Sequence, residues 1–208
     1  LLLEIENNIL RAVATDGHRL AFSQDILNDT VISKAVIIPR KGVLELLRLL
    51  DGDNDITLEL GENHVRIDFG NIVFTSKLID GKFPEYGRVI PSDTSNHLTA
   101  EKDTLKTSLQ RTAILSNEKY RGIRLIIKEN EMILQAHNPE QEEAEETLDI
   151  RYSGNNIEVG FNVTYLIDAL AAIDSQEVRL SMVDGNSSCL ICDPNNEDTK
   201  FVVMPMRL

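Results

Sequence analysis

The chain has 208 residues, of which 42% are hydrophobic and 26% are charged, a composition typical of a folded globular protein. No apolar run approaches the roughly 20 residues of a membrane-spanning helix, so we expect no membrane span. The formal net charge of −13 argues against a protein that grips nucleic acid over its whole surface, because phosphate binding depends on Lys and Arg. Cys189 and Cys192 are too few for a disulfide framework, which favours the reducing cytoplasm.

The first half of the chain predicts mostly strands. The turn Asp16-Gly17 ends a first strand. Gly42 is predicted to start a helix at 43–50, where apolar residues share one face. Strands are predicted at 9–14, 35–38, 56–60, 65–69 and 72–78. Because the segment 90–96 is polar and holds Pro91, we expect a linker there and two domains, at 1–91 and 92–208.

The second half repeats this plan. Helices are predicted at 102–116 and at 163–173, the second capped by Asn162. Strands are predicted at 122–128, 132–136, 147–152, 157–161, 178–183, 187–192 and 200–208. A strand, a helix and three antiparallel strands thus recur after about 120 residues, with 43–50 matching 163–170. The first copy shows no counterpart of 102–116 or 122–128, so we expect its beginning to be missing, in agreement with a start at Leu1 instead of Met.

The turn Asp16-Gly17-His18-Arg19 brings three ionisable side chains together in four residues. One reading is a hydrolase in which Asp16 orients His18 as a general base. A structural turn and a binding surface are the alternatives, and no Ser or Cys lies in a nucleophile-elbow pattern beside it. The sequence alone favours the structural turn.

Metal and redox motifs are weak. Cys189 and Cys192 have redox-like spacing, but they fall in an alternating strand that points them to opposite faces. An acidic series fits calcium-loop spacing but has Ile56 where the loop needs Gly; it comprises Asp51, Asp53, Asp55, Glu59 and Glu62. The four histidines show no ligand spacing, so we expect no metal and no cofactor.

Three charged or apolar stretches suggest binding. Arg40 and Lys41, placed just before a helix, oppose its dipole and together with free backbone N–H groups suggest a phosphate site. The acidic run 140–146 is either a solvated loop or a surface for a basic partner. The apolar C-terminus, 201–208, is either a core strand or part of a groove whose Met side chains adapt to ligands.

Seven collinear motifs resemble those of the bacterial DNA polymerase III beta subunit, the sliding clamp. They lie at 14–21, 36–43, 74–84, 114–122, 138–146, 160–163 and 202–208, and include Pro39-Arg40-Lys41-Gly42 and Met204-Pro205-Met206-Arg207-Leu208. The resemblance implies an α+β fold of tandem clamp domains, with antiparallel sheets outside and helices on the inner face. By this match the chain lacks the first of three domains and the start of the second.

The resemblance implies a processivity factor without catalysis, which encircles duplex DNA as a homodimeric ring when full length. Without the first domain this chain is not expected to close a ring. The implied partners are sequence-independent duplex DNA, the DNA polymerase III alpha subunit, the clamp loader delta subunit, other polymerases and mismatch-repair proteins. Proteins of this family carry short clamp-binding motifs that lie in a groove between the second and third domains.

The resemblance also implies three sets of site residues. The peptide groove would use Thr15, Gly17, His18, Arg19, Leu20, Pro84, Arg88, Val89, Tyr120, Asn162, Tyr165, Ser188, Val202, Val203, Met204, Pro205, Met206, Arg207 and Leu208. The residues facing DNA would be Arg40 and Lys41, and those at the dimer interface Ile114, Leu115, Glu142, Glu143, Glu145 and Glu146. On this view His18 and Arg19 form a groove wall that faces the C-terminal methionines.

Overall fold

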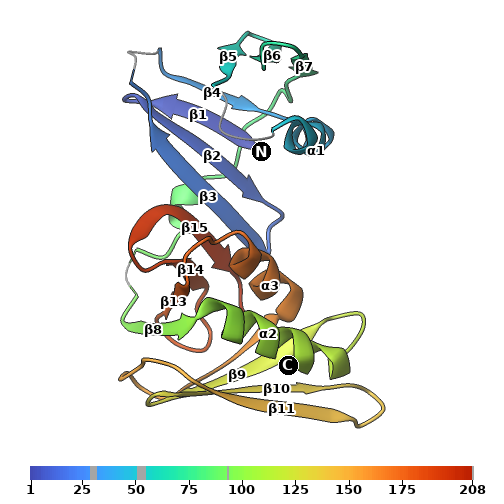
Figure 1. Cartoon of the computed structure of the whole chain (residues 1–208), viewed down its shortest axis with the longest axis vertical. Coiled ribbons are helices and arrows are strands. Elements are labelled where there is room, and N and C mark those ends of the chain that lie inside the picture. The colour runs from blue at the N-terminus through green and yellow to red at the C-terminus, as the bar shows by residue number, and fades with distance from the viewer. Residues whose placement is uncertain (29–31, 51–54, 93, 208) are drawn as a thin grey trace. The chain divides into compact units, whose positions relative to one another are not determined.

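A computed structural model describes residues 1–28, 32–50, 55–92 and 94–207 (Figure 1). The chain forms two compact units, which are described separately. Unit 1 comprises Leu1–Thr15 and Phe22–Tyr86, and unit 2 comprises Asp16–Ala21 and Gly87–Leu208. The turn that stands out in the sequence therefore belongs to unit 2.

Unit 1 is built from two antiparallel sheets and one helix. The first sheet has the order β4-β1-β2-β3 and the second β5-β6-β7. The strands are β1 (Leu2–Glu6), β2 (Ile9–Thr15), β3 (Arg19–Ile26), β4 (Lys34–Ile37), β5 (Thr57–Leu60), β6 (His64–Asp68) and β7 (Val73–Lys77); the helix is α1 (Arg40–Leu49). Ile38, Leu46, Val65 and Ile67 form the buried core, which joins α1 to the second sheet.

Helix α1 begins three residues earlier than predicted. Pro39 is its N-cap, with φ −65° and ψ 149°, so Arg40 and Lys41 lie in the first turn rather than before it. Gly42, which the prediction placed at the helix start, is buried inside this turn. A methyl group at Gly42 would lie 2.9 Å from Ser76 Oγ, so glycine lets α1 approach β7 closely.

Unit 2 packs two helices between two antiparallel sheets. The sheets have the orders β11-β10-β9-β12 and β15-β14-β13-β8. The strands are β8 (Asn96–Glu101), β9 (Gly122–Lys128), β10 (Glu131–His137), β11 (Glu143–Asp149), β12 (Ile157–Asn162), β13 (Glu177–Met182), β14 (Cys189–Asp193) and β15 (Asn196–Val203). The helices are α2 (Lys102–Thr112) and α3 (Val163–Ala171). The short 3-10 helix η2 (Ala113–Leu115) follows α2, and η1 (Tyr86–Arg88) lies before β8, where unit 1 ends at Tyr86.

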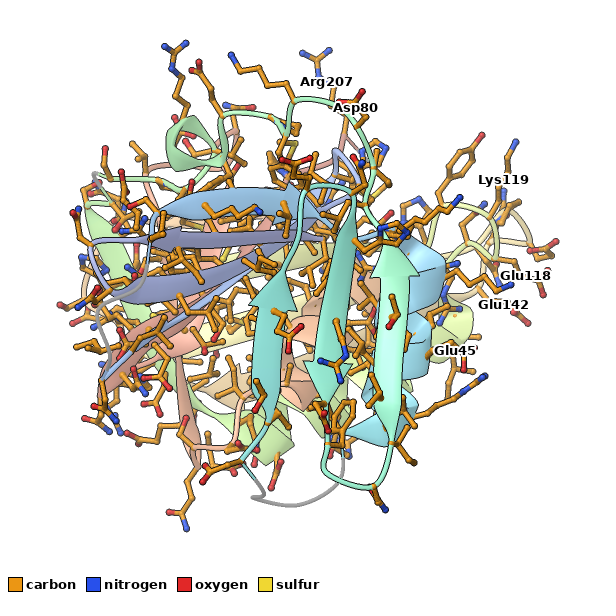
Figure 2. All side chains as sticks on the ribbon, turned by 90° about the horizontal axis from the view of Figure 1, so that it is seen from above. Glu45, Asp80, Glu118, Lys119, Glu142 and Arg207 are labelled. Carbon is orange, nitrogen blue, oxygen red and sulfur yellow. The ribbon has the colours of Figure 1, made fainter. Side chains whose placement is uncertain are left out.

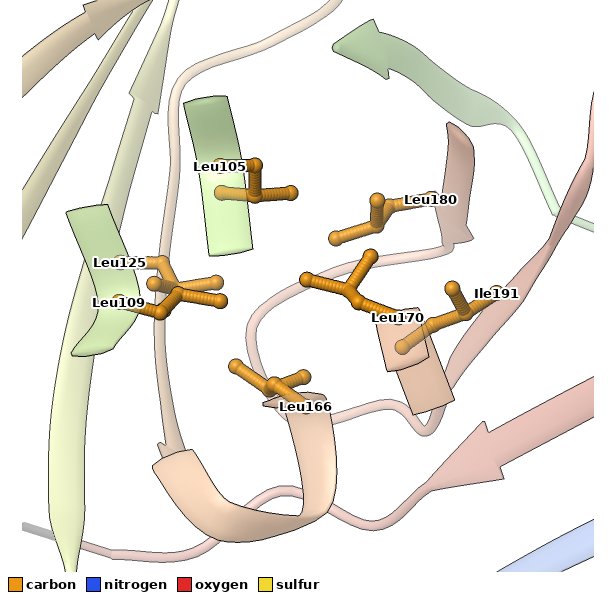
Figure 3. A pocket seen from close by; sticks show the side chains of 7 residues that line it. All are labelled: Leu105, Leu109, Leu125, Leu166, Leu170, Leu180 and Ile191. Carbon is orange, nitrogen blue, oxygen red and sulfur yellow. The ribbon is translucent and has the colours of Figure 1, made fainter. Parts of the chain in front are cut away.

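Helix caps and leucine packing fix these helices. Glu101 accepts hydrogen bonds from the N–H groups of Asp103 and Thr104 at the start of α2, and Asn162 caps α3 as predicted. Figure 1 shows α2 lying along β10 and β11. Figure 3 shows where leucines of both helices meet those of the sheets: Leu105, Leu109, Leu125, Leu166, Leu170, Leu180 and Ile191. The space between them is only about 10 Å³, so this is a closed core and not a ligand site.

The internal repeat is present and is more complete than the sequence suggested. In unit 1 the series β1-β2-β3-β4-α1-β5-β6-β7 follows the same plan as β9-β10-β11-β12-α3-β13-β14-β15 in unit 2, and the sheet orders β4-β1-β2-β3 and β12-β9-β10-β11 correspond. The prediction that the first copy lacks a counterpart of 122–128 is therefore wrong, because β1 fills that place. The helix starts align Arg40, and not Val43, with Val163.

Three other predictions need correction. The segment predicted as linker up to residue 96 already begins β8 at Asn96. For the acidic run 140–146 the loop alternative is wrong in part, because residues 143–146 lie in β11, a strand whose Ala144 and Leu148 are less exposed than their neighbours. The chain ends its last strand at Val203 instead of continuing to 208. In the described ranges, no helix is long and apolar enough to cross a membrane.

Candidate functional site: the Asp16–Ala21 turn and the C-terminal segment

Asp16 organises the turn of unit 2. Its Oδ1 accepts hydrogen bonds from the backbone N–H groups of His18, at 3.0 Å, and Arg19, at 3.1 Å. Gly17 has φ +89°, a conformation that residues with a side chain rarely adopt. Burial acts to raise the pKa of Asp16, but the hydrogen bonds from His18 and Arg19 outweigh it and hold the pKa below its ordinary value of 3.8. The carboxylate is thus a structural acceptor.

Arg19 joins the turn to helix α3. Its Nε donates to Asp16 Oδ2 at 3.1 Å, and its Nη1 donates to Asp168 Oδ2 at 2.6 Å. The guanidinium carbon also lies 4.3 Å from the centroid of the Tyr165 ring, within cation–π range. Two carboxylates and one aromatic face therefore hold the arginine in a single orientation, with its side chain 36% exposed.

The C-terminal segment lies against the same turn. The Met204 N–H donates to the carbonyl oxygen of His18 at 2.9 Å, and the Met206 N–H donates to that of Gly160 at 2.9 Å. Val202 and Val203 are buried in β15, so their side chains serve the core. The exposed part of the segment begins at Met204, whose residue surface is 37% exposed, and Pro205 and Met206 are half-buried. Adaptable apolar side chains are thus presented beside His18.

A pocket of about 380 Å³ lies at the end of this segment. Tyr120 and Met206 line it together with Asn117, Gly122, Gln135, His137, Asn138, Pro139 and Arg207. The Tyr120 loop is fixed by Asn117, whose Oδ1 accepts from the N–H groups of Lys119 and Tyr120. The Asn162 side chain donates to the Tyr120 carbonyl oxygen at 3.3 Å. Figure 2 shows Lys119 and Arg207 pointing away from the ribbon.

The structure brings a subset of the predicted groove residues together. His18, Arg19, Tyr165 and Met204 are joined by the contacts above, and Leu20 is buried beneath them. Ser188 is half-buried before β14, while Arg88 ends η1 and is followed by the half-buried Val89. Thr15 and Pro84 are exposed residues of unit 1, and Leu208 is outside the described residues.

The other predicted surfaces are also exposed. Arg40 and Lys41 are exposed in the first turn of α1. Ile114 is 77% exposed, although it is a large apolar residue, and Leu115 beside it is half-buried. Glu142, just before β11, and Glu143 and Glu145 in β11 are exposed, whereas Glu146 pairs with Arg111 and accepts from Ser108 Oγ at 2.8 Å.

The geometry contradicts the catalytic reading of the turn. Asp16 Oδ1 accepts from the backbone N–H groups of His18 and Arg19, and Oδ2 accepts from the Arg19 side chain, so both oxygens are engaged by groups other than the His18 ring. Cys189 is fully buried, and burial raises the pKa of its thiol to about 12, so it is not a reactive thiolate. Among the described residues no cluster of His, Cys, Asp or Glu could hold a metal ion; Asp51 and Asp53 of the calcium-like series lie outside them.

Sequence reasoning missed Asp168, Gly160 and Asn117. Asp168 is separated from Arg19 by 149 positions, so no local pattern points to their pairing. The one available signal is helical spacing, because Asp168 lies three residues after Tyr165 and therefore on the same face of α3. Gly160 contributes only its carbonyl oxygen, which a sequence does not reveal.

The repeated plan defines a tandem of two related α+β domains, and in the second unit a turn is held against the C-terminal segment. Residues 1–85 match the family model described as DNA polymerase III beta subunit, central domain, and residues 87–207 match the C-terminal domain of the same subunit. The chain belongs to the DNA polymerase III beta subunit family. The resemblance and the α+β clamp fold expected from the sequence are confirmed.

Individual relatives agree with this assignment. The chain is 50% identical to the beta sliding clamp of Escherichia coli (strain K12) over 209 residues and to that of Pseudomonas aeruginosa over 210 residues. A crystal structure of the P. aeruginosa sliding clamp bound to griselimycin has 48% identity and a TM-score of 0.96. Each comparison covers 100% of this chain and 57% of the relative. Family membership also confirms the prediction that the chain is not an enzyme.

Proposed function

We propose that the chain supplies the second and third domains of a sliding clamp that acts as a processivity factor in bacterial DNA replication. The observation that carries this proposal is the match of both family models, in order, along the chain. We assign 1–91 to the second domain and 92–208 to the third. In a full-length, ring-shaped homodimer such a protein holds a polymerase on duplex DNA without gripping it, which agrees with the net charge of −13.

We further propose that the turn and the C-terminal segment bind the clamp-binding motifs of partner proteins. Such a site needs a preformed apolar surface with a polar edge. Met204 and Met206 supply the apolar part, and both are held by backbone hydrogen bonds. Arg19, fixed by Asp16 and Asp168, supplies the polar edge. The partners would include the polymerase III alpha subunit, the clamp loader delta subunit, other polymerases and mismatch-repair proteins.

We also propose roles for the two other exposed surfaces, a DNA contact for Arg40 and Lys41 and a dimer interface for the surface around Ile114. Arg40 and Lys41 face the DNA and make sparse, sequence-independent phosphate contacts, because both are exposed in the first turn of α1. The dimer interface consists of Ile114, Leu115, Glu142, Glu143, Glu145 and Glu146. An isoleucine with 77% exposure is expected at such an interface, where a partner subunit removes it from water.

The experiment that tests this function is the binding of a fluorescein-labelled Gln-Leu-Ser-Leu-Phe peptide, measured by fluorescence anisotropy. We expect saturable binding that is lost when Met206–Leu208 is deleted, while the melting temperature changes little because the last strand ends at Val203. A scrambled peptide of the same composition is the control. Equal binding of both peptides, or none of either to the chain and to its full-length parent, would argue for an interaction protein unrelated to replication.

A further inference from the structure

A second pocket of unit 2 shares no lining residue with the pocket at Tyr120 and Met206, and its residues Gly87 and Ile90 flank Arg88 and Val89 of the predicted groove. It measures about 630 Å³ and lies between the β8-β13-β14-β15 sheet and the segment that precedes β8. Gly87, Ile90 and Pro91 form one wall. Arg179 of β13, Lys200 of β15 and Leu190 of β14 form another. This volume is within the range of about 300–1,000 Å³ that ligand pockets occupy, and it is far larger than a single small anion needs.

The charges of this pocket are not balanced. Arg179 and Lys200 share one carboxylate, that of Glu197, and the Lys200 Nζ lies 3.6 Å from Glu197 Oε2. Both cationic side chains are 26% exposed, whereas the Glu197 side chain is 57% exposed. The cations are therefore held at the pocket wall, and the carboxylate is the partner that is free to rotate into solvent. Two cations and one acid leave a local positive charge in a chain whose net charge is −13.

The deeper part of the pocket is polar and ordered. Ser181 is 1% exposed, and its Oγ lies 2.8 Å from Nδ1 of His97 on the neighbouring strand. The Arg179 guanidinium also reaches Cys192 Sγ at 3.5 Å, which limits its rotation. A preoriented guanidinium is the side chain best suited to a carboxylate, because its two parallel N–H groups match the two oxygens.

We propose that this pocket binds a short acidic segment of a partner protein, one that also carries an apolar residue. An incoming carboxylate takes the place of Glu197 on Arg179 and Lys200, and the apolar residue packs against Ile90 and Leu190. Charge complementarity selects the acidic segment, and the apolar residues Ile90, Pro91 and Leu190 favour a peptide that carries an apolar side chain over nucleic acid. The pocket thereby adds a second contact for partners that bind at the Met204 surface, which raises their avidity.

The test uses the fluorescein-labelled peptide Glu-Glu-Leu-Glu-Glu and its neutral counterpart Gln-Gln-Leu-Gln-Gln with the whole chain. We expect the acidic peptide to bind saturably and the neutral one at least three-fold more weakly. Arg179→Gln combined with Lys200→Gln should weaken the acidic peptide by about three- to ten-fold, since each exposed ion pair contributes modestly. Glu197→Gln should tighten it by about two-fold, because the internal competitor is gone. Lys200→Gln alone is the second variant if the double variant fails to fold.

Arg66→Gln is the matched control, since Arg66 is also a strand arginine paired with an exposed carboxylate, that of Glu59, but lies in unit 1. It should leave the affinity unchanged. An excess of unlabelled Gln-Leu-Ser-Leu-Phe should not displace the acidic peptide. Displacement by that peptide, equal binding of the neutral peptide, or insensitivity to Lys200→Gln would overturn the proposal. So would stronger binding of a labelled DNA duplex at this pocket, or self-association of the chain that the double variant abolishes.

Discussion

The substitution Arg19→Ala tests whether the turn is held ready for a ligand. In unit 2 the Arg19 guanidinium contacts Asp16 at 3.1 Å and Asp168 at 2.6 Å, and lies 4.3 Å from the centroid of the Tyr165 ring. Alanine removes all three contacts at once. It leaves the hydrogen bond between Met204 N–H and the His18 carbonyl oxygen in place, because that bond uses only backbone atoms.

The size of the effect follows from the exposure of these groups. The side chains of Arg19, Asp16 and Asp168 are 36%, 47% and 54% exposed, so each ion pair contributes only about 0.2–1 kcal/mol. An exposed cation–π contact adds about 0.5–1 kcal/mol. The loss of all three contacts, about 1–3 kcal/mol together, loosens the turn locally. If ligand binding must restore the order, affinity for the pentapeptide falls by about five-fold to about a hundred-fold, since each 1.4 kcal/mol is a factor of ten.

The assay is fluorescence anisotropy with labelled Gln-Leu-Ser-Leu-Phe, accompanied by a thermal melt. Asp168→Asn should reproduce part of the loss, and the double variant Arg19→Ala with Asp168→Asn should be no weaker than Arg19→Ala alone. Arg66→Ala in unit 1 is the control for removing an exposed ion pair. Unchanged affinity of Arg19→Ala, or losses of the two single variants that simply add, would refute the reasoning.

Three further outcomes are expected. Burial raises the pKa of Tyr86 to about 12, and the Tyr86 hydroxyl donates to Glu4 at 2.6 Å. The stabilisation from the neutral hydroxyl is therefore complete below the ordinary pKa of 10.0 and is lost as the pH rises through about 12. Tyr86→Phe should remove this alkaline loss in pH-dependent melts and lower the free energy of unfolding of unit 1 by about 1 kcal/mol at pH 7. Because the pKa of Asp16 is lowered, the stabilisation of the turn by its carboxylate is present above pH 3.8 and is lost as the pH falls below that value. Anisotropy titrations should show the affinity of the wild type for the peptide falling below pH 3.8. The affinity of Asp16→Asn should be weaker and should not change with pH in this range. Leu166→Ala, at a site 2% exposed, should cost about 3 kcal/mol and shift only the calorimetric transition of unit 2; a shift of both transitions would contradict the separate cores.

The regular part of the fold was predictable because periodicity and caps are local. Helix α3 follows Asn162 as the sequence indicates, and the hairpin of β9 and β10 turns at Asn130, which adopts φ 57°. The errors have physical reasons. The sequence suggests that Gly42 starts α1, but in the structure Gly42 is buried in the first turn, where the absence of a side chain lets the helix approach Ser76. The edge strand β11 was difficult to predict, because three of its four exposed positions, Glu143, Glu145 and Asp149, are acidic.

The site was predictable only in part. The turn and the C-terminal segment stood out by their residue types, but nothing in either stretch specifies the backbone hydrogen bond between His18 and Met204, which are 186 positions apart. Arg19 was identified through the resemblance, while its partner Asp168 looked like any exposed acid on a helix. The sequence does not predict the pocket at Arg179 and Lys200, because its residues come from separate strands and no motif marks its charged residues.

The most direct test of the central claim is a ¹⁵N–¹H chemical-shift titration of the chain with unlabelled Gln-Leu-Ser-Leu-Phe. If the peptide binds where the turn meets the C-terminal segment, the amide signals of His18, Arg19, Met204 and Met206 should shift together and saturate at one dissociation constant. Signals of β6 in unit 1 should remain in place as the internal control. Saturable shifts confined to other residues, with the His18 and Met204 amides unmoved, would contradict the account.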